Sequence, residues 1–248
     1  MIKLFRKIRH KLLIESKLRK YFLYAIGEII LVVIGILIAL HINNLNDQRK
    51  IGNTIQTYYN QLLQDFENDK KYIESTIASI DSSAIELESY RRVFDKPNLS
   101  TNEIFSSFKL IEWSVTQIQF QSNTINTLER TGDFNLIPLT IRNKLLDYKR
   151  KQEITTKVSE GNNQRFVDQA DFATTRYFGS SNFMIRSSNQ PDLSKYINDK
   201  ERSIKSIIAL ESAIQSKEDS ERNTLKSFKQ LLQKIEEITK LIKNELVK

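Results

Sequence analysis

A single apolar stretch, residues 22–42, constrains this chain more than any other feature. It reads FLYAIGEIILVVIGILIALHI and contains one formally charged residue, Glu28. A helix of about 20 apolar residues rises about 1.5 Å per residue and crosses the roughly 30 Å hydrocarbon core of a bilayer. The stretch therefore predicts a transmembrane helix, which we place at residues 21–43.

The first 20 residues carry nearly all of the net charge of the chain. They hold eight basic residues against one acid, Glu15, which gives a net charge of +7, and the whole chain has +8. Lys and Arg concentrated within about 20 residues of a span mark its cytoplasmic side. Residues 1–20 are thus expected to form a cytoplasmic arm that contacts the membrane surface through Lys3, Arg6, Lys7, Arg9, Lys11, Lys17, Arg19 and Lys20.

The composition of the N-terminal region is also compatible with other roles. A basic arm can bind nucleic acid, but a span follows it at once, so no nucleic-acid partner is expected. The arm can also lie on anionic headgroups as an amphipathic helix, which is compatible with the same topology. The apolar core is too long for a cleaved signal peptide and no small-x-small site follows it, so an uncleaved signal anchor is predicted.

The apolar pattern beyond the span is helical. Residues 43–94 contain no Pro and one Gly, Gly52, and apolar residues recur there every three or four positions. This predicts that the span continues, bent near Asn43–Asn44 or Gly52, into a stalk helix that ends at residues 95–98.

Shorter elements are expected next. The S-x-x-E spacing at Ser100 predicts a capped helix over residues 101–113, followed by an extended loop at 115–121. A helix over 124–130, capped by Ser122 or Asn123, should end at Gly132 in a left-handed turn.

Two more long helices complete the pattern. One is predicted over residues 139–177, and the last one runs from a cap at Asp192 or Ser194 to the C-terminus. The last helix has a nearly all-polar middle, residues 215–223, where loose contact is expected.

Long helices with such connections pack antiparallel. The predicted fold is all-α: one N-terminal transmembrane helix continues into an elongated antiparallel bundle, residues 44–248, with three long helices. Residues 95–137 should form short helices at the membrane-distal tip. The loop near 179–193 should lie at the membrane edge, and the C-terminus should point away from it.

Residue types that carry chemistry are sparse. The chain has no Cys, and its two His residues, His10 and His41, flank the span on opposite sides. There is no glycine-rich phosphate loop, no H-E-x-x-H and no G-x-S-x-G. We therefore expect no enzyme activity, no cofactor and no metal. Trp113 and its aromatic neighbours can either line a ligand pocket at the tip or belong to the core.

Glu28 is the most informative single residue, because an ionisable side chain within a span is costly and suggests a function. Glu28 shares one helix face with small residues that let another helix approach closely. The face predicts helix association, with a lipid-edge carboxylate and a proton-carrying site as alternatives. Its residues are Tyr24, Glu28, Leu31, Gly35 and Ala39.

Several motifs are recognisable in the chain: the basic opening MIKLFRKIRHKLL, the span GEIILVVIGILIAL and the exit INNLN within the first 46 residues, and NTINTLERTGDFNLI further on. The first three closely resemble, and the last more loosely resembles, a family of bacterial envelope proteins of unknown function. Leu45 stands where a Trp is common in that family. The resemblance implies an inner-membrane protein with a helical periplasmic domain. Gly27, Glu28 and Gly35 are family features of the span, which favours helix association and adds Gly27 to the expected association residues. It implies no activity.

These observations favour a single-pass scaffold or accessory subunit of an envelope complex. Its expected partners are the lipid bilayer and either other membrane proteins or further copies of the chain, through span and stalk. The alternative is a periplasmic ligand-binding sensor. With only about 20 cytoplasmic residues, such a sensor must pass its signal to a partner protein.

Overall fold

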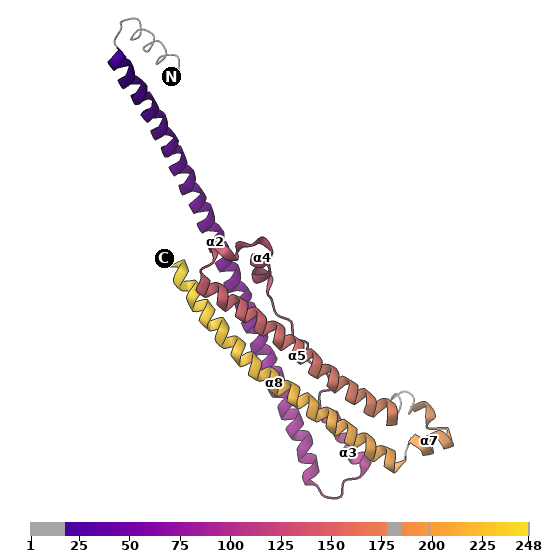
Figure 1. Cartoon of the computed structure of the whole chain (residues 1–248). Coiled ribbons are helices and arrows are strands. Elements are labelled where there is room, and N and C mark those ends of the chain that lie inside the picture. Colours follow the sequence, from indigo (N-terminus) through magenta and orange to yellow (C-terminus); the bar gives the residue numbers. More distant parts are fainter. Residues whose placement is uncertain (1–17, 178–184, 198, 248) are drawn as a thin grey trace. The chain divides into compact units, whose positions relative to one another are not determined.

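The computed structural model describes residues 18–177, 185–197 and 199–247, and within these ranges it contains helices and no strand (Figure 1). The predicted all-α class is confirmed. Contacts divide the chain into two units, Met1–Thr57 and Tyr58–Lys248. The predicted domains, 1–20, 21–43 and 44–248, were defined by the expected position of the membrane. The division by contacts does not test these boundaries, so they stay predictions.

The longest helix, α2, extends over Leu18–Arg92 and belongs to both units. It continues without interruption through Asn43–Asn44 and Gly52, where a bend was expected. No proline occurs within it, so no backbone N–H is missing and no ring clashes with the preceding turn. The predicted continuation of the apolar helix into a stalk is therefore confirmed.

The described part of the first unit is the N-terminal half of α2. Its apolar side chains are exposed, from Phe22 at 67% to Ile42 at 61%. No residue of its most apolar 18-residue window, with a mean hydropathy of 2.7, is buried. This segment is long and apolar enough to cross a membrane, and it does not serve as a core helix among the described residues.

The second unit is built on three long helices: α2 from Tyr58 onward, α5 at Leu139–Tyr177 and α8 at Lys200–Leu246. They lie along one another in Figure 1. Each turns an apolar stripe inward, as the three- and four-residue spacing predicts. The core formed in this way includes Leu62, Phe66, Ile73, Leu145, Tyr148, Phe228, Leu231 and Ile238.

Helix α8 runs antiparallel to both other long helices. Against α2, Glu218 accepts from Arg91 at 2.7 Å, and Glu221 accepts from the earlier residue Ser83 at 3.0 Å. Against α5, Lys144 pairs with Glu237 at 2.7 Å. The last turns of α8 reach the Tyr58 end of the bundle, where burial, with a contribution from the charge of Glu245, raises the pKa of Tyr59.

Helices α2 and α5 therefore run in the same direction, and the expectation that they are antiparallel is wrong. The reason is a non-helical return segment, residues 111–122, which we call the strap. It follows α3 (Thr101–Ser107) and the 3₁₀ turn η2 (Phe108–Leu110) and leads back along α2 to α4 (Asn123–Thr131). The extended loop predicted at 115–121 is part of it.

Contacts along the strap show its direction. The Glu112 N–H donates to Glu86 of α2 at 3.1 Å, and the Thr124 N–H after the strap donates to Asp65 at 2.9 Å. Residues 95–137 therefore do not form a single tip. Helix α3 lies at the Arg92 end of this unit and α4 lies at the Tyr58 end. The C-terminal turns of α8 also lie at the Tyr58 end, which differs from the expected arrangement.

The sequence predicted the ends of the short helices more accurately than it predicted the direction of the long ones. Ser100 and Glu103 form the capping box of α3, although this helix ends at Ser107 and not at 113. Gly132 ends α4 with φ 77°, and a 3₁₀ turn, η3 (Asp133–Leu136), precedes α5. Ser122 does not cap α4 with its side chain, because its hydroxyl donates to Gln152.

The last helix was predicted as one element, and this is wrong. Helix α7 covers Pro191–Ile197 and α8 begins at Lys200. Neither Asp192 nor Ser194 caps α8. Its cap is Asp199, whose carboxylate accepts the Arg202 N–H at 3.0 Å.

The polar middle of α8 is not loosely packed, which corrects another expectation. Lys217 and Ser220 are buried. The Lys217 ammonium donates to Ser83 of α2 and to Glu221, and the Ser220 hydroxyl donates to Asn163 of α5 at 3.2 Å. These polar groups satisfy each other, so residues 215–223 pack closely although they contribute no apolar side chain.

Candidate functional site

The predicted association face lies on the N-terminal half of α2. Its members follow at spacings of four, three, four and four residues, so one uninterrupted helix carries them on one side. Glu28 is half-buried and the others are exposed. They are Tyr24, Glu28, Leu31, Gly35 and Ala39.

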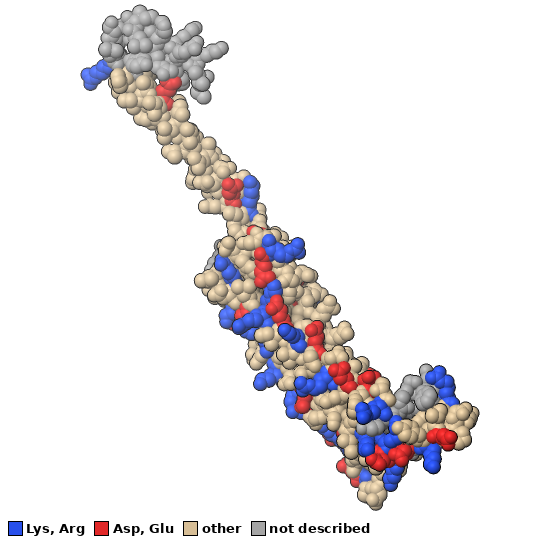
Figure 2. Space-filling view, turned by 45° about the vertical axis from the view of Figure 1, so that its right-hand side comes forward, with Lys and Arg blue, Asp and Glu red and all other residues tan. Residues whose placement is uncertain are grey.

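The two glycines of the span leave open space. A Cβ added at Gly35, or at Gly27 on the margin of the face, would meet no atom within 4 Å. Figure 2 shows the described apolar stretch as a surface with few charges. The face therefore offers a shallow, uncharged strip with one carboxyl group near its N-terminal end, a shape that a second helix can approach closely.

The predicted membrane-surface residues can be placed only in part. Lys3, Arg6, Lys7, Arg9, Lys11 and Lys17 lie outside the described residues. Arg19 is exposed in the first turn of α2, and Lys20 belongs to the same helix. The role of this arm stays a prediction.

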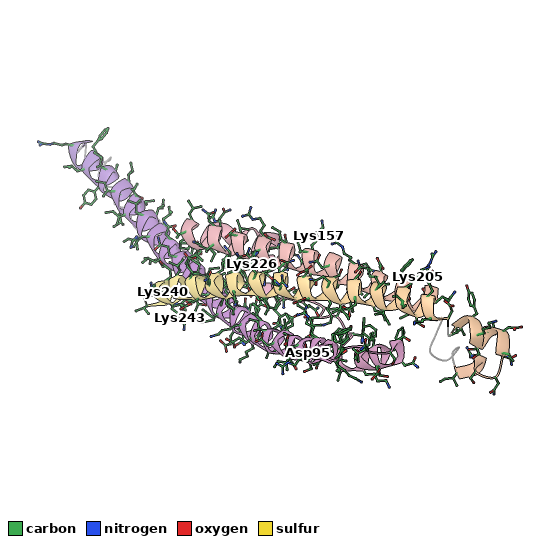
Figure 3. All side chains as sticks on the ribbon, turned by 90° about the horizontal axis from the view of Figure 1, so that it is seen from below. Asp95, Lys157, Lys205, Lys226, Lys240 and Lys243 are labelled. Carbon is green, nitrogen blue, oxygen red and sulfur yellow. The ribbon has the colours of Figure 1, made fainter. Side chains whose placement is uncertain are left out.

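The described ranges contain no group of three or more His, Asp or Glu residues that could hold a metal ion. His41 is exposed on α2, and His10 lies outside these ranges. Figure 3 shows Lys157 on α5 and Lys205, Lys226, Lys240 and Lys243 on α8 spread along the bundle and not gathered at one place.

Trp113 is part of the aromatic core. Its ring stacks on Phe166 with centroids 6.0 Å apart, and its indole N–H donates to the Phe108 carbonyl at 3.0 Å. Phe108 in turn stacks on Tyr90. Of the two alternatives left open for Trp113, the structure supports core packing.

A buried polar network, which the sequence reasoning missed, joins α2, the strap and α5. Asp69 is 1% exposed. One of its oxygens accepts the Gln121 N–H at 2.7 Å. The other accepts the Tyr148 hydroxyl and the Gln152 amide, both at 2.8 Å. The Gln152 carbonyl accepts the Ser122 hydroxyl at 2.8 Å.

Burial raises the pKa of Asp69 against the opposing effect of these three hydrogen bonds. Burial also raises the pKa of Tyr148, and the nearby Asp69 charge adds to it. The network therefore fixes the strap and leaves no free nucleophile. A signal for it exists in the sequence, because Asp69 lies on the apolar stripe of α2 between Phe66 and Ile73.

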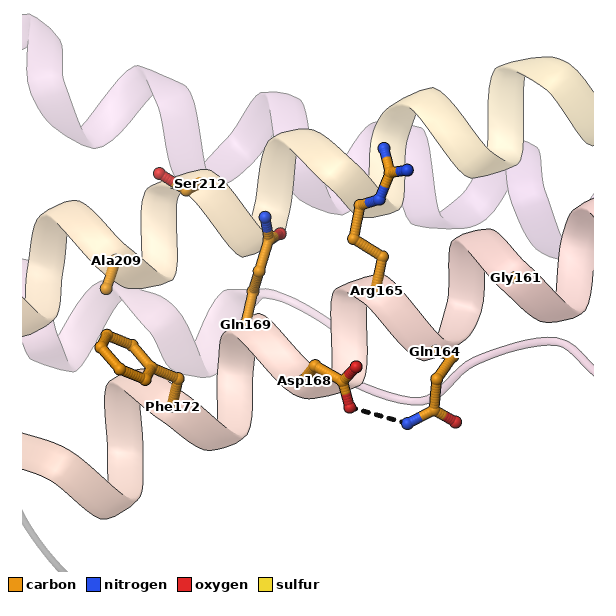
Figure 4. Close-up of a pocket in the computed structure, with 8 residues that line it drawn as sticks. All are labelled: Gly161, Gln164, Arg165, Asp168, Gln169, Phe172, Ala209 and Ser212. Carbon is orange, nitrogen blue, oxygen red and sulfur yellow. Dashed lines mark hydrogen bonds between the residues drawn. The ribbon is translucent and has the colours of Figure 1, made fainter.

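The bundle surface has grooves on both sides of α5. The groove between α5 and α8 has a volume of about 680 Å³ (Figure 4). Phe172 and Ala209 form its apolar part, and Gln164 donates to Asp168 at 2.7 Å on its α5 wall. Two further grooves, of about 670 and 630 Å³, separate α5 from the strap.

No protein-family model, no curated protein and no solved structure matches this chain. The resemblance of its first residues to an envelope family therefore stays an expectation.

Proposed function

We propose that this protein is a single-pass membrane-anchored scaffold or accessory subunit. In this proposal residues 22–42 cross a bacterial inner membrane, the basic arm stays in the cytoplasm and the helical bundle lies in the periplasm. The observation that carries the proposal is the exposed apolar half of α2, which no described part of the chain covers. In water such a surface would be unfavourable, and in a bilayer it would not.

The charge distribution supports the proposed orientation. The first 20 residues hold a net charge of +7 out of +8 for the whole chain, which is the asymmetry typical of a cytoplasmic flank. The Glu28 face supports association with another membrane helix, either from a partner protein or from a second copy. The sensor alternative has less support, because Trp113 packs into the core and does not open a pocket.

Membrane insertion and orientation can be tested together. The full chain, tagged at its C-terminus and expressed in bacteria, should stay in the membrane fraction after alkaline carbonate extraction. Protease added to spheroplasts should remove the tag. Release by carbonate would contradict the anchor, and a protected tag would contradict the orientation.

The association face needs a separate test with a matched control. Membranes are crosslinked, and proteins that co-purify with wild type, Glu28→Leu, Gly35→Leu and Val33→Leu are identified by mass spectrometry. Val33 is exposed on the opposite side of the same helix. Glu28→Leu and Gly35→Leu should lose a partner that Val33→Leu keeps. An identical set of proteins in all four samples would remove the association face from the proposal.

A further inference from the structure

The strap offers a backbone edge that the described chain leaves unused. Its odd-numbered residues bond to α2: the Gln117 carbonyl and the Gln119 N–H both bond to the Tyr72 hydroxyl, at 2.9 and 3.2 Å, and the Gln121 N–H donates to Asp69. Bonds at every second residue indicate extended backbone, in which neighbouring residues direct their polar groups to opposite edges.

The even-numbered residues point their side chains inward. Ile118 is buried, and the Phe120 ring meets Tyr72 of α2 and Phe228 of α8 at 6.0 Å each. Because the backbone groups of the odd-numbered residues face α2, those of the even-numbered residues face away from α2, toward α5. The Thr116 carbonyl confirms this direction, because it accepts from Asn163 of α5 at 2.8 Å.

Between Thr116 and Ser122 this second edge has no hydrogen-bond partner among the described residues. The backbone N–H and C=O groups of Ile118 and Phe120 form no hydrogen bond within the described residues. The two grooves between strap and α5 lie along this edge and adjoin each other, since Ile118, Gln119 and Glu160 line both of them. Each volume is within the range of natural ligand sites.

We infer that this groove binds an extended peptide segment of a partner protein, which pairs with the strap as an added strand. Free donors and acceptors at every second residue match the backbone of an extended peptide at a strand spacing of about 4.8 Å. The two grooves would take its alternate side chains, as in other strand-addition sites. This inference concerns the second unit alone and does not depend on the proposed membrane anchor.

Glu160 allows the site to be blocked without touching the strap. It is exposed on α5, lines both grooves and has no hydrogen-bond or ion-pair partner in the described chain. A Trp at this position should fill the groove. Asp171 is exposed on the same helix and lines neither strap groove, so Asp171→Trp is the matched control.

The experiment selects random decapeptides displayed on phage against the full chain in detergent solution, which does not require insertion into a bilayer. Circular dichroism first checks that both variants keep the helix content of wild type. Selected peptides should lose about tenfold or more in affinity for Glu160→Trp, and less than about twofold for Asp171→Trp. Peptide binding should also slow hydrogen exchange at Ile118 and Phe120 by about tenfold or more.

Three results would overturn the inference. The first is that no peptide is enriched, which means that only water satisfies this edge. The second is that the selected peptides bind Glu160→Trp as well as wild type. The third is that exchange at Ile118 and Phe120 is unchanged on binding, which excludes strand pairing even if a peptide binds in the groove. None of these results bears on membrane insertion.

Discussion

Asp69 shows at the scale of one residue how a buried charge can position a segment without doing chemistry. Its carboxylate receives three hydrogen bonds from two different elements, and two of the donors are themselves buried. Removing an acceptor from such a site leaves donors without partners, which costs more than the bonds contribute on balance. The same low-dielectric surroundings explain why burial raises the pKa of Asp69.

Asp69→Asn should therefore lower the free energy of unfolding by about 1–3 kcal/mol, because an NH₂ group replaces one acceptor. The substitution should also change how the free energy of unfolding depends on pH. Because the pKa of Asp69 is raised in the folded state, its titration stabilises the fold fully below pH 3.8, the ordinary pKa. This stabilisation decreases as pH rises through the raised pKa. The asparagine variant should lack this decrease.

Urea unfolding of the full chain in detergent, followed by circular dichroism at several pH values, measures both effects. Asp81→Asn is the control, since Asp81 is exposed on the same helix. Equal pH slopes for wild type and Asp69→Asn would show that Asp69 titrates alike in the folded and unfolded states.

Helices were predicted best where their first and last residues are determined by residues close to them in the sequence. The capping box at Ser100 and Glu103, the left-handed Gly132 and the range of α5 all follow from short-range rules. Helical spacing alone also predicts that Tyr24 and Ala39 share one side of α2, and association through this side stays a prediction. The break before α8 was missed because Asp199 competes with two other good caps, Asp192 and Ser194.

The start of α3 gives a prediction at this scale. The Lys96 ammonium, which donates to Glu103, and then the Ser100 backbone and hydroxyl lower the pKa of Glu103 to about 2. A lowered pKa means that the cap is fully stabilising above pH 4.5, the ordinary value, and that this stabilisation is lost as pH falls toward 2.

The amide proton of Ser100 bonds to Glu103 at 2.9 Å and so reports on this titration. Its NMR chemical shift should change with a midpoint near pH 2 in wild type. In Lys96→Ala the midpoint should move up toward the ordinary value, because the first cause of the shift is gone. A wild-type midpoint near pH 4.5 would mean that the capping box does not persist in solution.

At the scale of the whole molecule, the direction of α5 was not predictable from periodicity. Apolar stripes tell which faces are buried, but they are the same for a helix that runs up or down. The direction depends on the strap, and the strap is held by polar groups of α2 that bond to its backbone. Asp69, Tyr72 and Glu86 recognise N–H and C=O groups, which every residue has, so no side-chain pattern in residues 111–122 indicates the pairing.

The path of the strap can be tested by crosslinking, since the chain has no native Cys. The Asn68 amide donates to Gln121 at 3.1 Å, Gln121 is exposed and Asn68 is partly exposed, so Asn68→Cys with Gln121→Cys should react with a short bis-maleimide. Asn68→Cys with Asn102→Cys is the control, because Asn102 belongs to α3 at the Arg92 end, about 36 Å along α2 from Asn68. If the strap did not return along α2, residue 121 would stay with 102 far from residue 68, and neither pair would crosslink. Crosslinking of the first pair alone requires that the chain doubles back before α5 begins, and it is this return that makes α5 parallel to α2.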